Sequence, residues 1–205
     1  LFDIIEKTTG STLDYLSNKY FYEPLGMKNT FFNPPLELNN NIAPTENDKY
    51  FRNKLLKGIV HDENAYLLGG ISGHAGLFST AEDIGAYSKM LIDGGCYLGQ
   101  RYFSKNTIKE FTQRQNITLE SDFALGWDTP SQNGKSSAGD YLSDSSFGHL
   151  GFTGTSMWLD PENKIIVILL TNRIYPTRNK KNIGKRMYDF RRKFHMKLIK
   201  EILEV

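Results

Sequence analysis

The sequence predicts an α+β fold in which helices come first, an antiparallel hairpin follows and one long helix closes the chain. The hairpin is the strongest of these signals. A glycine- and aromatic-rich run, residues 147–159, precedes the turn signal Asp160-Pro161-Glu162-Asn163, and the apolar run 164–171 follows it. Helical periodicity with recognisable caps on either side of the hairpin supports the mixed class.

The helices before the hairpin are predicted from their caps and their apolar spacing. Residues 1–7 are helical in pattern from the first position. Three further N-caps follow along the chain: Ser11 or Thr12, the Ser79-Thr80-Ala81-Glu82 capping box, and Ser104. We expect Pro24 to end the first of these helices and Gly94-Gly95 to end the second.

The closing helix is predicted over residues 181–203. Its apolar positions recur at helical spacing and are Ile183, Met187, Phe190, Phe194, Leu198 and Ile202. Basic residues interleave with them, namely Arg178, Lys180, Lys181, Lys185, Arg186, Arg191, Arg192, Lys193, Lys197 and Lys200. We interpret these as the solvated face of an amphipathic helix, and a membrane-surface or polyanion-binding role is the alternative.

The connecting segments carry fewer signals. Residues 33–53 have the composition of a loop because proline and asparagine are frequent there, and a long loop in a compact domain is often functional. Residues 123–127 are predicted to form a strand, and residues 129–137 a polar excursion after it.

Composition and charge narrow the classes of function. The 205 residues carry a formal net charge of +2, so electrostatics give no case for nucleic-acid binding. Cys96 is the only cysteine, so no disulfide can form within the chain and the redox compartment is left open. No stretch approaches the roughly 20 apolar residues of a membrane-spanning helix.

The glycines of the run 147–155 predict a binding site on the main chain. They leave the backbone unshielded, so that a ligand can hydrogen-bond it directly. His149 stands among them, where an imidazole can relay a proton or hold the carboxylate of a substrate. The alternative is a histidine that hydrogen-bonds a backbone carbonyl at the end of a strand.

Four segments, in this order, resemble the serine β-lactamase and penicillin-binding family, and specifically its class C-like esterases and peptidases. They are Leu25-Gly26-Met27-Lys28-Asn29-Thr30-Phe31-Phe32, the Gly-His-Ala-Gly-Leu-Phe-Ser-Thr-Ala-Glu-Asp run of residues 73–83, the His-Leu-Gly-Phe-Thr-Gly-Thr run of residues 149–155, and Leu169-Leu170-Thr171-Asn172-Arg173-Ile174-Tyr175-Pro176. Within the third, His149-Leu150-Gly151 is similar to the Lys/His-Thr-Gly triplet that lines the family's active site.

The resemblance implies a partial β-lactamase/transpeptidase-like fold, an antiparallel sheet flanked by helices, and hydrolysis of an amide or ester through an acyl-enzyme. It implies catalytic roles for His149, for Gly151 and for Phe152, whose backbone N–H would donate to the oxyanion. It places Thr153 among the substrate-binding residues, and Leu150 at a position that is usually threonine. Because leucine cannot bind a carboxylate, the balance moves from β-lactams toward an esterase, amidase or peptidase.

The nucleophile of the resembled family is missing from this chain. No serine here is followed three residues later by lysine, so there is no Ser-x-x-Lys. We therefore expect residues 1–205 to be the C-terminal portion of a single β-lactamase-like domain whose nucleophile-bearing part precedes it. Such a piece would expose an unpaired sheet edge, so the missing N-terminal segment or a swapped copy is its expected partner.

Three further positions are candidates for binding. His74 lies in a glycine-rich loop, where it either lines the cleft or only shapes the loop. Arg173 can pair with a carboxylate of substrate or protein. His61-Asp62-Glu63 has no metalloprotease spacing, so we expect no metal, and we expect Asp62 and Glu63 to bond nearby backbone at a turn.

Two hypotheses about function stay open on the sequence. The first is a serine hydrolase that acts on a small-molecule or peptidoglycan-derived substrate without a cofactor, in a compartment that the resemblance suggests is periplasmic or otherwise extracytoplasmic. The second is a catalytically silent binding or accessory module, because Leu150 and the absent serine both weaken the site. The resemblance includes fusions to family 3 glycoside hydrolases, so such a module could belong to an N-acetylglucosaminidase.

Overall fold

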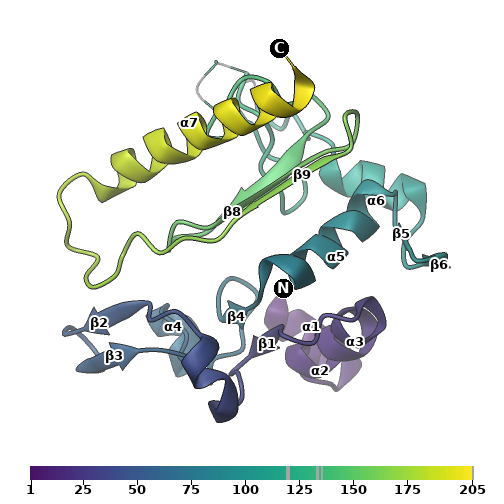
Figure 1. Cartoon of the computed structure of the whole chain (residues 1–205). Coiled ribbons are helices and arrows are strands. Elements are labelled where there is room, and N and C mark those ends of the chain that lie inside the picture. The colour runs from purple at the N-terminus through teal and green to yellow at the C-terminus, as the bar shows by residue number, and fades with distance from the viewer. Residues whose placement is uncertain (119–120, 133, 135, 205) are drawn as a thin grey trace. The chain divides into compact units, whose positions relative to one another are not determined.

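A computed structural model describes residues 1–118, 121–132, 134 and 136–204 (Figure 1). The chain divides into two compact units. The first comprises Leu1–Tyr87 with Ile174–Lys180, and the second comprises Ser88–Arg173 with Lys181–Val205. Each unit is described by itself.

The first unit begins with a series of short helices. They are α1 (Phe2–Thr9), α2 (Leu13–Ser17), a π-helical turn (Asn18–Tyr22) and α3 (Glu23–Leu25). The helix predicted at residues 1–7 is confirmed, but Pro24 does not end the next one. Pro24 lies in the first turn of α3, where its missing N–H costs no helical hydrogen bond, and Gly26 ends the series with φ 72°.

The predicted loop at residues 33–53 contains regular structure, so that prediction is wrong in part. A 3₁₀ helix (Leu36–Asn41) is followed by β2 (Glu46–Asp48), which pairs with β3 (Lys54–Leu56). The buried carboxylate of Asp48 closes this hairpin by accepting from the backbone N–H groups of Tyr50, Phe51 and Arg52. The turn between β2 and β3 contains no glycine, and the Asp48 side chain stabilises it by accepting these backbone hydrogen bonds.

Glu46 ties the returning segment Ile174–Lys180 to this unit. Its carboxylate is fully buried and accepts from the backbone N–H of Arg178 at 2.6 Å, from Arg178 Nε at 2.8 Å and from His61 Nε2 at 2.8 Å. Burial by itself would raise the pKa of the Glu46 carboxyl, but these donors outweigh it and the pKa is lowered. Asn47 N–H adds a bond to the Pro176 carbonyl.

The remaining elements of the first unit frame the glycine-rich loop. They are α4 (Glu63–Leu67) and a two-stranded pair of β1 (Phe31–Phe32) with β4 (Leu77–Phe78). The helix α5 (Ala81–Ile92) begins in this unit and crosses the boundary at Ser88. Thr80 Oγ1 accepts from Asp83 N–H at its start, and Gly94 N–H bonds Leu91 at its end, so both predicted boundaries are confirmed.

The second unit continues with a small hairpin, β5 (Cys96–Tyr97) with β6 (Gln100–Arg101), and with α6 (Lys105–Thr112). Ser104 caps α6 as predicted, because its Oγ accepts from Thr107 N–H at 3.0 Å. The strand predicted at residues 123–127 is wrong: Ala124 N–H bonds the Trp127 carbonyl in a tight turn, and only isolated bridges form there. Positions 133 and 135 of the predicted polar excursion lie outside the described residues.

The main sheet of the second unit is an antiparallel meander of three strands, β7 (Phe147–Leu150), β8 (Ser156–Asp160) and β9 (Ile165–Leu169). The turn after Asp160 and the strand that follows it are confirmed. The run 147–155 is not one strand, however, because residues 151–155 turn the chain between β7 and β8. Gly148 is needed for packing, since a Cβ there would lie 2.2 Å from the Met157 carbonyl and 2.7 Å from the Trp158 ring.

The closing helix α7 (Ile183–Leu203) lies along this sheet (Figure 1). Ile199 packs with Ile165 and Val167 of β9 in one buried cluster. The helix is confirmed, but its buried face matches the predicted apolar stripe only in part. Of the predicted positions Met187 is buried, and the other buried residues are Arg191, His195 and Ile199.

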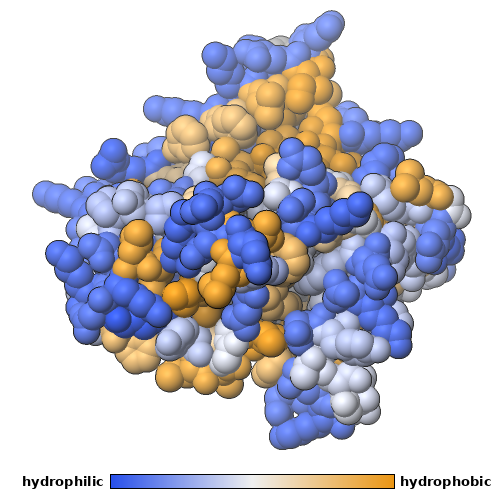
Figure 2. Space-filling model, turned by 60° about the horizontal axis from the view of Figure 1, so that its bottom comes forward, coloured by the Kyte–Doolittle hydropathy of each residue, from blue (hydrophilic) through white to orange (hydrophobic). Residues whose placement is uncertain are grey.

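Two residues of the predicted stripe are exposed to solvent. Phe190 is 49% exposed and Ile202 is 51% exposed, while Phe194 and Leu198 pack against the sheet cluster from its margin. On the face that Figure 2 shows, exposed apolar residues, in orange, lie among hydrophilic ones, in blue. No helix of the described residues is both long and apolar enough to cross a membrane.

The turn between β8 and β9 is built on the fully buried carboxylate of Asp160. It accepts from the backbone N–H groups of Ser143, Glu162 and Asn163, and also from Ser143 Oγ and Asn163 Nδ2. Burial alone would raise the pKa of the Asp160 carboxyl, but the five donors outweigh burial and lower it. The turn therefore depends on a charged carboxylate.

We predict that Asp160→Asn lowers the free energy of unfolding at pH 7 by about 2 kcal/mol, because hydrogen bonds to a buried charge are lost. Since the pKa is lowered on folding, the stabilisation is complete above the unfolded-state pKa of about 3.9 and is lost as the pH falls through and below it. The difference between the two proteins should therefore narrow below about pH 4. Urea unfolding monitored by fluorescence of the buried Trp158 measures both effects.

Asp144→Asn is the matched control, because Asp144 is an exposed acid in the same segment. An equal loss of stability in both variants, or a difference that persists unchanged at pH 3, would contradict the role assigned to the Asp160 carboxylate.

Candidate active site

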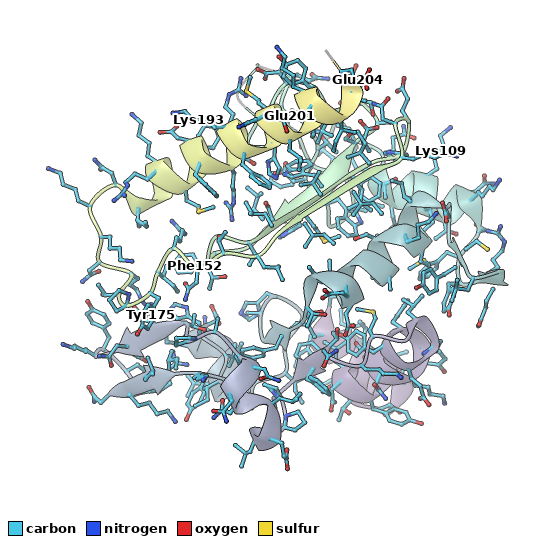
Figure 3. All side chains as sticks on the ribbon, viewed as in Figure 1. Lys109, Phe152, Tyr175, Lys193, Glu201 and Glu204 are labelled. Atoms are coloured by element: carbon cyan, nitrogen blue, oxygen red, sulfur yellow. The ribbon has the colours of Figure 1, made fainter. Side chains whose placement is uncertain are left out.

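The candidate site is the Gly151–Thr155 turn together with His149, at one end of the main sheet. The turn closes on itself, because Gly151 N–H bonds the Thr155 carbonyl at 2.8 Å and Gly154 N–H bonds the Gly151 carbonyl at 3.0 Å. A Cβ on Gly151 would lie 2.0 Å from Thr155 Oγ1, so only glycine fits this position. Figure 3 labels Phe152, the side chain at the outer part of the turn.

Two arginines hold the main chain of this turn. Arg191 is 7% exposed as a residue, and its guanidinium donates to the carbonyls of Gly151, Gly154 and Thr155 at 2.8, 3.1 and 2.5 Å. Arg173 donates from Nε to the Phe152 carbonyl at 2.6 Å and from its backbone N–H to the Thr153 carbonyl at 2.7 Å. All five carbonyl oxygens of the turn therefore accept hydrogen bonds from within the protein.

The direction of the carbonyls fixes the direction of the amides. In a planar trans peptide the N–H of one residue points opposite to the C=O of the residue before it. The peptide that joins Gly151 to Phe152 is trans, and its carbonyl faces Arg191, so the N–H of Phe152 points away from that guanidinium. The same argument directs the N–H of Thr153 away from the Arg173 guanidinium.

Arg191 is a buried cation at the centre of this arrangement. Burial and the nearby charge of Arg173 lower the pKa of its guanidinium, which still remains protonated because an arginine is not deprotonated in proteins. Its charge is balanced by carbonyl dipoles, and no carboxylate contact to it is described. We had expected Arg191 on the solvated face of α7, and that expectation is wrong because position 191 faces the sheet.

His149 is exposed at the end of β7, opposite Met157 in the register. Its Nδ1 lies 3.0 Å from the Leu150 carbonyl, which can only accept, so Nδ1 carries the proton and Nε2 is the basic nitrogen of the neutral ring. The local arrangement is thus the histidine-to-carbonyl contact at a strand end that the sequence left as the alternative, and the catalytic role of His149 stays a prediction. It also presents an imidazole nitrogen that can exchange a proton.

Asp128 is a neighbour of this site that the sequence did not reveal. Its backbone pairs with that of Gly148 through two hydrogen bonds of 2.8 and 2.9 Å. Burial and the charge of Asp122 raise the pKa of its carboxyl, while His149 and Arg114 act in the opposite direction. No local sequence signal could have placed it here, because a β-bridge from a non-strand segment brings it to the sheet.

The other predicted site residues divide between the two units. Leu150 pairs with Ser156 and Thr153 lies in the turn, so both lie at the candidate site, and their substrate-binding role stays a prediction. Arg173 holds the Phe152 carbonyl, and its guanidinium lies 4.9 Å from the centre of the Phe152 ring; its pairing with a carboxylate stays a prediction. His74 lies in the first unit, where it contacts Ser72 and Asp62.

The histidines and acids near His61 are engaged with one another and with arginine. His61 contacts Glu46, Asp62 caps α4 by accepting from Ala65 N–H as expected, and Glu63 pairs with Arg178 rather than with backbone. Among the residues that the structure describes, no group of three or more histidine, cysteine, aspartate or glutamate side chains is arranged to hold a metal ion.

We predict that Arg191→Met releases the Gly151–Thr155 turn. Loss of three charge-assisted hydrogen bonds should lower the free energy of unfolding by about 2–4 kcal/mol and speed hydrogen exchange at the amides of residues 151–155. Arg186→Met, an exposed arginine on the same helix, is the control and should change neither quantity. Unchanged exchange in the turn of Arg191→Met would show that Arg191 does not hold it.

Comparisons with known proteins agree with this fold. The sequence matches the family described as Beta-lactamase over residues 1–188. A protein of Salmonella agona named "Putative D-alanyl-D-alanine carboxypeptidase" is 37% identical over an alignment of 187 residues, and the match covers 83% of this chain and 42% of that protein. The chain therefore spans less than half the length of the curated relatives it matches.

Solved structures show the same fold at low identity. A beta-lactamase from Mycobacterium bovis gives a TM-score of 0.63 at 16% identity, covering 95% of this chain and 58% of its own. A mutant of the simvastatin synthase of Aspergillus terreus gives 0.67 at 16% identity, covering 100% of this chain and 53% of its own. The predicted partial β-lactamase-like fold is confirmed, and the chain belongs to the Beta-lactamase family.

Proposed function

We propose that this chain is the C-terminal portion of a serine hydrolase that cleaves an amide or ester through an acyl-enzyme. In this proposal the Phe152 N–H donates to the oxyanion of the tetrahedral intermediate, and His149 Nε2 exchanges a proton with the nucleophile or leaving group. One observation carries it: Arg191 and Arg173 hold every carbonyl of the Gly151–Thr155 turn and so direct the Phe152 N–H away from Arg191.

The chemistry of an oxyanion site explains why such a rigid turn is useful. A donor that is already oriented stabilises the developing charge without reorganisation at the moment of reaction, and removal of one such donor typically costs about 3 kcal/mol of activation free energy. A flexible glycine turn would lose this advantage, because its peptide planes could rotate. The two arginines restrict that rotation at the five peptide units that matter here.

The substrate is proposed to be a peptide-like amide, such as one derived from peptidoglycan. The carboxypeptidase named among the relatives supports this class. Leu150 lies beside the site where the resembled triplet has threonine, and an alkyl side chain cannot hydrogen-bond a substrate carboxylate. An ester is therefore the second substrate class that we propose. If the substrate is instead the peptidoglycan-derived amide, a periplasmic or other extracytoplasmic location would follow.

The nucleophile is proposed to come from a segment that this sequence does not contain. The chain has no Ser-x-x-Lys, and it covers 42% of the relative from Salmonella agona. Two features of the second unit support a segment that packs against it. The first is that β9 pairs only with β8 among the described residues. The second is an open groove on α7, which is lined by Phe190, Lys193, Phe194, Lys197, Leu198 and Glu201. Figure 3 shows Lys193 and Glu201 along this helix.

A catalytically silent accessory module is the alternative, and Leu150 is the observation that favours it. The two proposals differ in one requirement. A hydrolase needs an upstream serine that reacts, whereas a binding module retains its function when that serine is absent.

The decisive test uses the full-length protein, with His149→Ala compared to the unchanged protein. We predict that kcat/KM for a D-alanyl-D-alanine-terminated peptide, or for an ester, falls by about 10²- to 10⁴-fold, because a proton-transfer group is removed. Glu162→Gln, an exposed change in the turn between β8 and β9, should leave kcat/KM unchanged. Full activity of His149→Ala, or failure of a fluorophosphonate to label a Ser-x-x-Lys serine, would exclude this mechanism.

A second measurement tests the proposed upstream segment. Amides of β9 should exchange more slowly in the full-length protein than in the 205-residue chain, because a new neighbour would cover the β9 edge. Helix α4 of the first unit is the internal control and should exchange alike in both. Protection that rises with concentration in the 205-residue chain would indicate a swapped copy, and equal protection in both proteins would exclude a covering segment.

A further inference from the structure

A hydrogen-bonded chain of serine, histidine and aspartate lies in the first unit. Ser72 Oγ is 2.8 Å from His74 Nδ1, and His74 Nε2 is 3.0 Å from Asp62 Oδ1. A nucleophile within hydrogen-bond reach of a base, with the base oriented by a third group, is the arrangement by which catalytic triads are recognised on unrelated folds. None of these residues is part of the Gly151–Thr155 site.

The aspartate decides which nitrogen of His74 carries the proton. A carboxylate only accepts, so Nε2–H donates to Asp62 and Nδ1 presents its lone pair. The Ser72 hydroxyl must then donate to Nδ1, which places the serine proton on the path to a base. The two ring nitrogens exchange the roles they have in the chymotrypsin arrangement, and the acid-base logic is unchanged.

The supporting contacts hold this chain in place. Asp62 Oδ1 also accepts from Ala65 N–H at 2.8 Å and so caps α4, which fixes the carboxylate relative to the helix. Ser72 and His74 are two residues apart, on either side of Gly73, in the loop between α4 and β4. The base is therefore oriented by regular structure on one side and by a short loop on the other.

The low exposure of Ser72 limits the size of the acyl donor that could react with it. The His74 side chain is 53% exposed, but Ser72 as a residue is only 5% exposed. A bulky acyl donor could not reach Ser72 Oγ without movement of the loop. A short acyl group on a good leaving group is the class of donor that this site fits.

We propose that Ser72 is a nucleophile that accepts a short acyl group from an activated ester, with His74 as its base and Asp62 as the residue that orients the base. Ser72 Oγ forms a bond to the acyl carbon while its proton passes to His74 Nδ1. The bond from the acyl carbon to the leaving oxygen breaks, and the alcohol or phenol departs with that proton. Water then attacks the acyl-serine by the reverse sequence and releases the acid.

The reaction needs neither His149 nor an upstream serine, so it can be tested on the 205-residue chain alone. Because this chain has no Ser-x-x-Lys, an acyl-serine on it is independent of the mechanism proposed for the full-length protein. The probe is p-nitrophenyl acetate, with release of p-nitrophenolate followed by absorbance, and with the acetylated residue located by peptide mass spectrometry after acid quench.

We expect one acetyl group on Ser72. Ser72→Ala should abolish that adduct, and His74→Gln should slow acetylation by about 10²-fold or more, because the base is lost. Ser88→Ala is the matched control: Ser88 is also buried, its Oγ has no hydrogen-bond partner among the described residues, and the variant should react like the unchanged chain.

Circular dichroism establishes that each variant is folded, and Ser72→Cys provides a second test should Ser72→Ala be unstable, because a thiol at this position should also be acylated. Acetylation confined to lysine or to other serines would overturn the proposal. So would an undiminished burst of p-nitrophenolate from Ser72→Ala, which would identify the exposed imidazole of His74 as the nucleophile instead.

Discussion

The second unit depends on the buried guanidinium of Arg191. This one side chain satisfies three carbonyls of the Gly151–Thr155 turn and at the same time anchors α7 to the end of the sheet. A buried cation with no acidic partner among the described residues is costly to desolvate, and the aligned carbonyl dipoles offset that cost. The position of the helix and the direction of the turn's amides are therefore set by the same contact.

Buried carboxylates play the corresponding part elsewhere in the molecule. Asp48 gathers backbone N–H groups at the β2–β3 hairpin, Asp160 does so at the β8–β9 turn, and Glu46 receives both the backbone and the side chain of Arg178. Each carboxylate replaces lost water with several donors, so the charged form is favoured in spite of burial. In each unit a charged, buried carboxylate therefore stabilises a hairpin turn: Asp48 in the first unit and Asp160 in the second.

Family membership and the proposed catalytic chemistry rest on different observations. Membership of the beta-lactamase family rests on the match over residues 1–188 and on the fold. The chemistry rests on a restrained turn beside an exposed imidazole, and it is incomplete in this chain because the nucleophile's motif is absent. Leu150 is where the two diverge: the fold is retained, and in the proposed mechanism an apolar side chain at this position cannot hydrogen-bond a substrate carboxylate.

Local signals in the sequence determined several helices, the caps at Thr80 and Ser104 and the segments that carry the family's pattern. Ser104 and Thr80 cap helices as expected, and the Asp160 turn lies where the dipeptide Asp160-Pro161 placed it, because such signals act over three or four residues. The family pattern located His149 and the Gly151–Thr155 turn for the same reason, since its residues are contiguous.

Only the tertiary structure decided which side chains these elements bury and bring together. The apolar spacing of α7 indicated Phe190 and Ile202, but the helix turns Arg191 and His195 toward the sheet, since the carbonyls of the turn need a donor. Asp128 reaches Gly148 through a bridge between segments 20 residues apart, and Asp62 reaches His74 across α4. Such contacts depend on how segments distant in the sequence pack together, so a local sequence pattern cannot predict them.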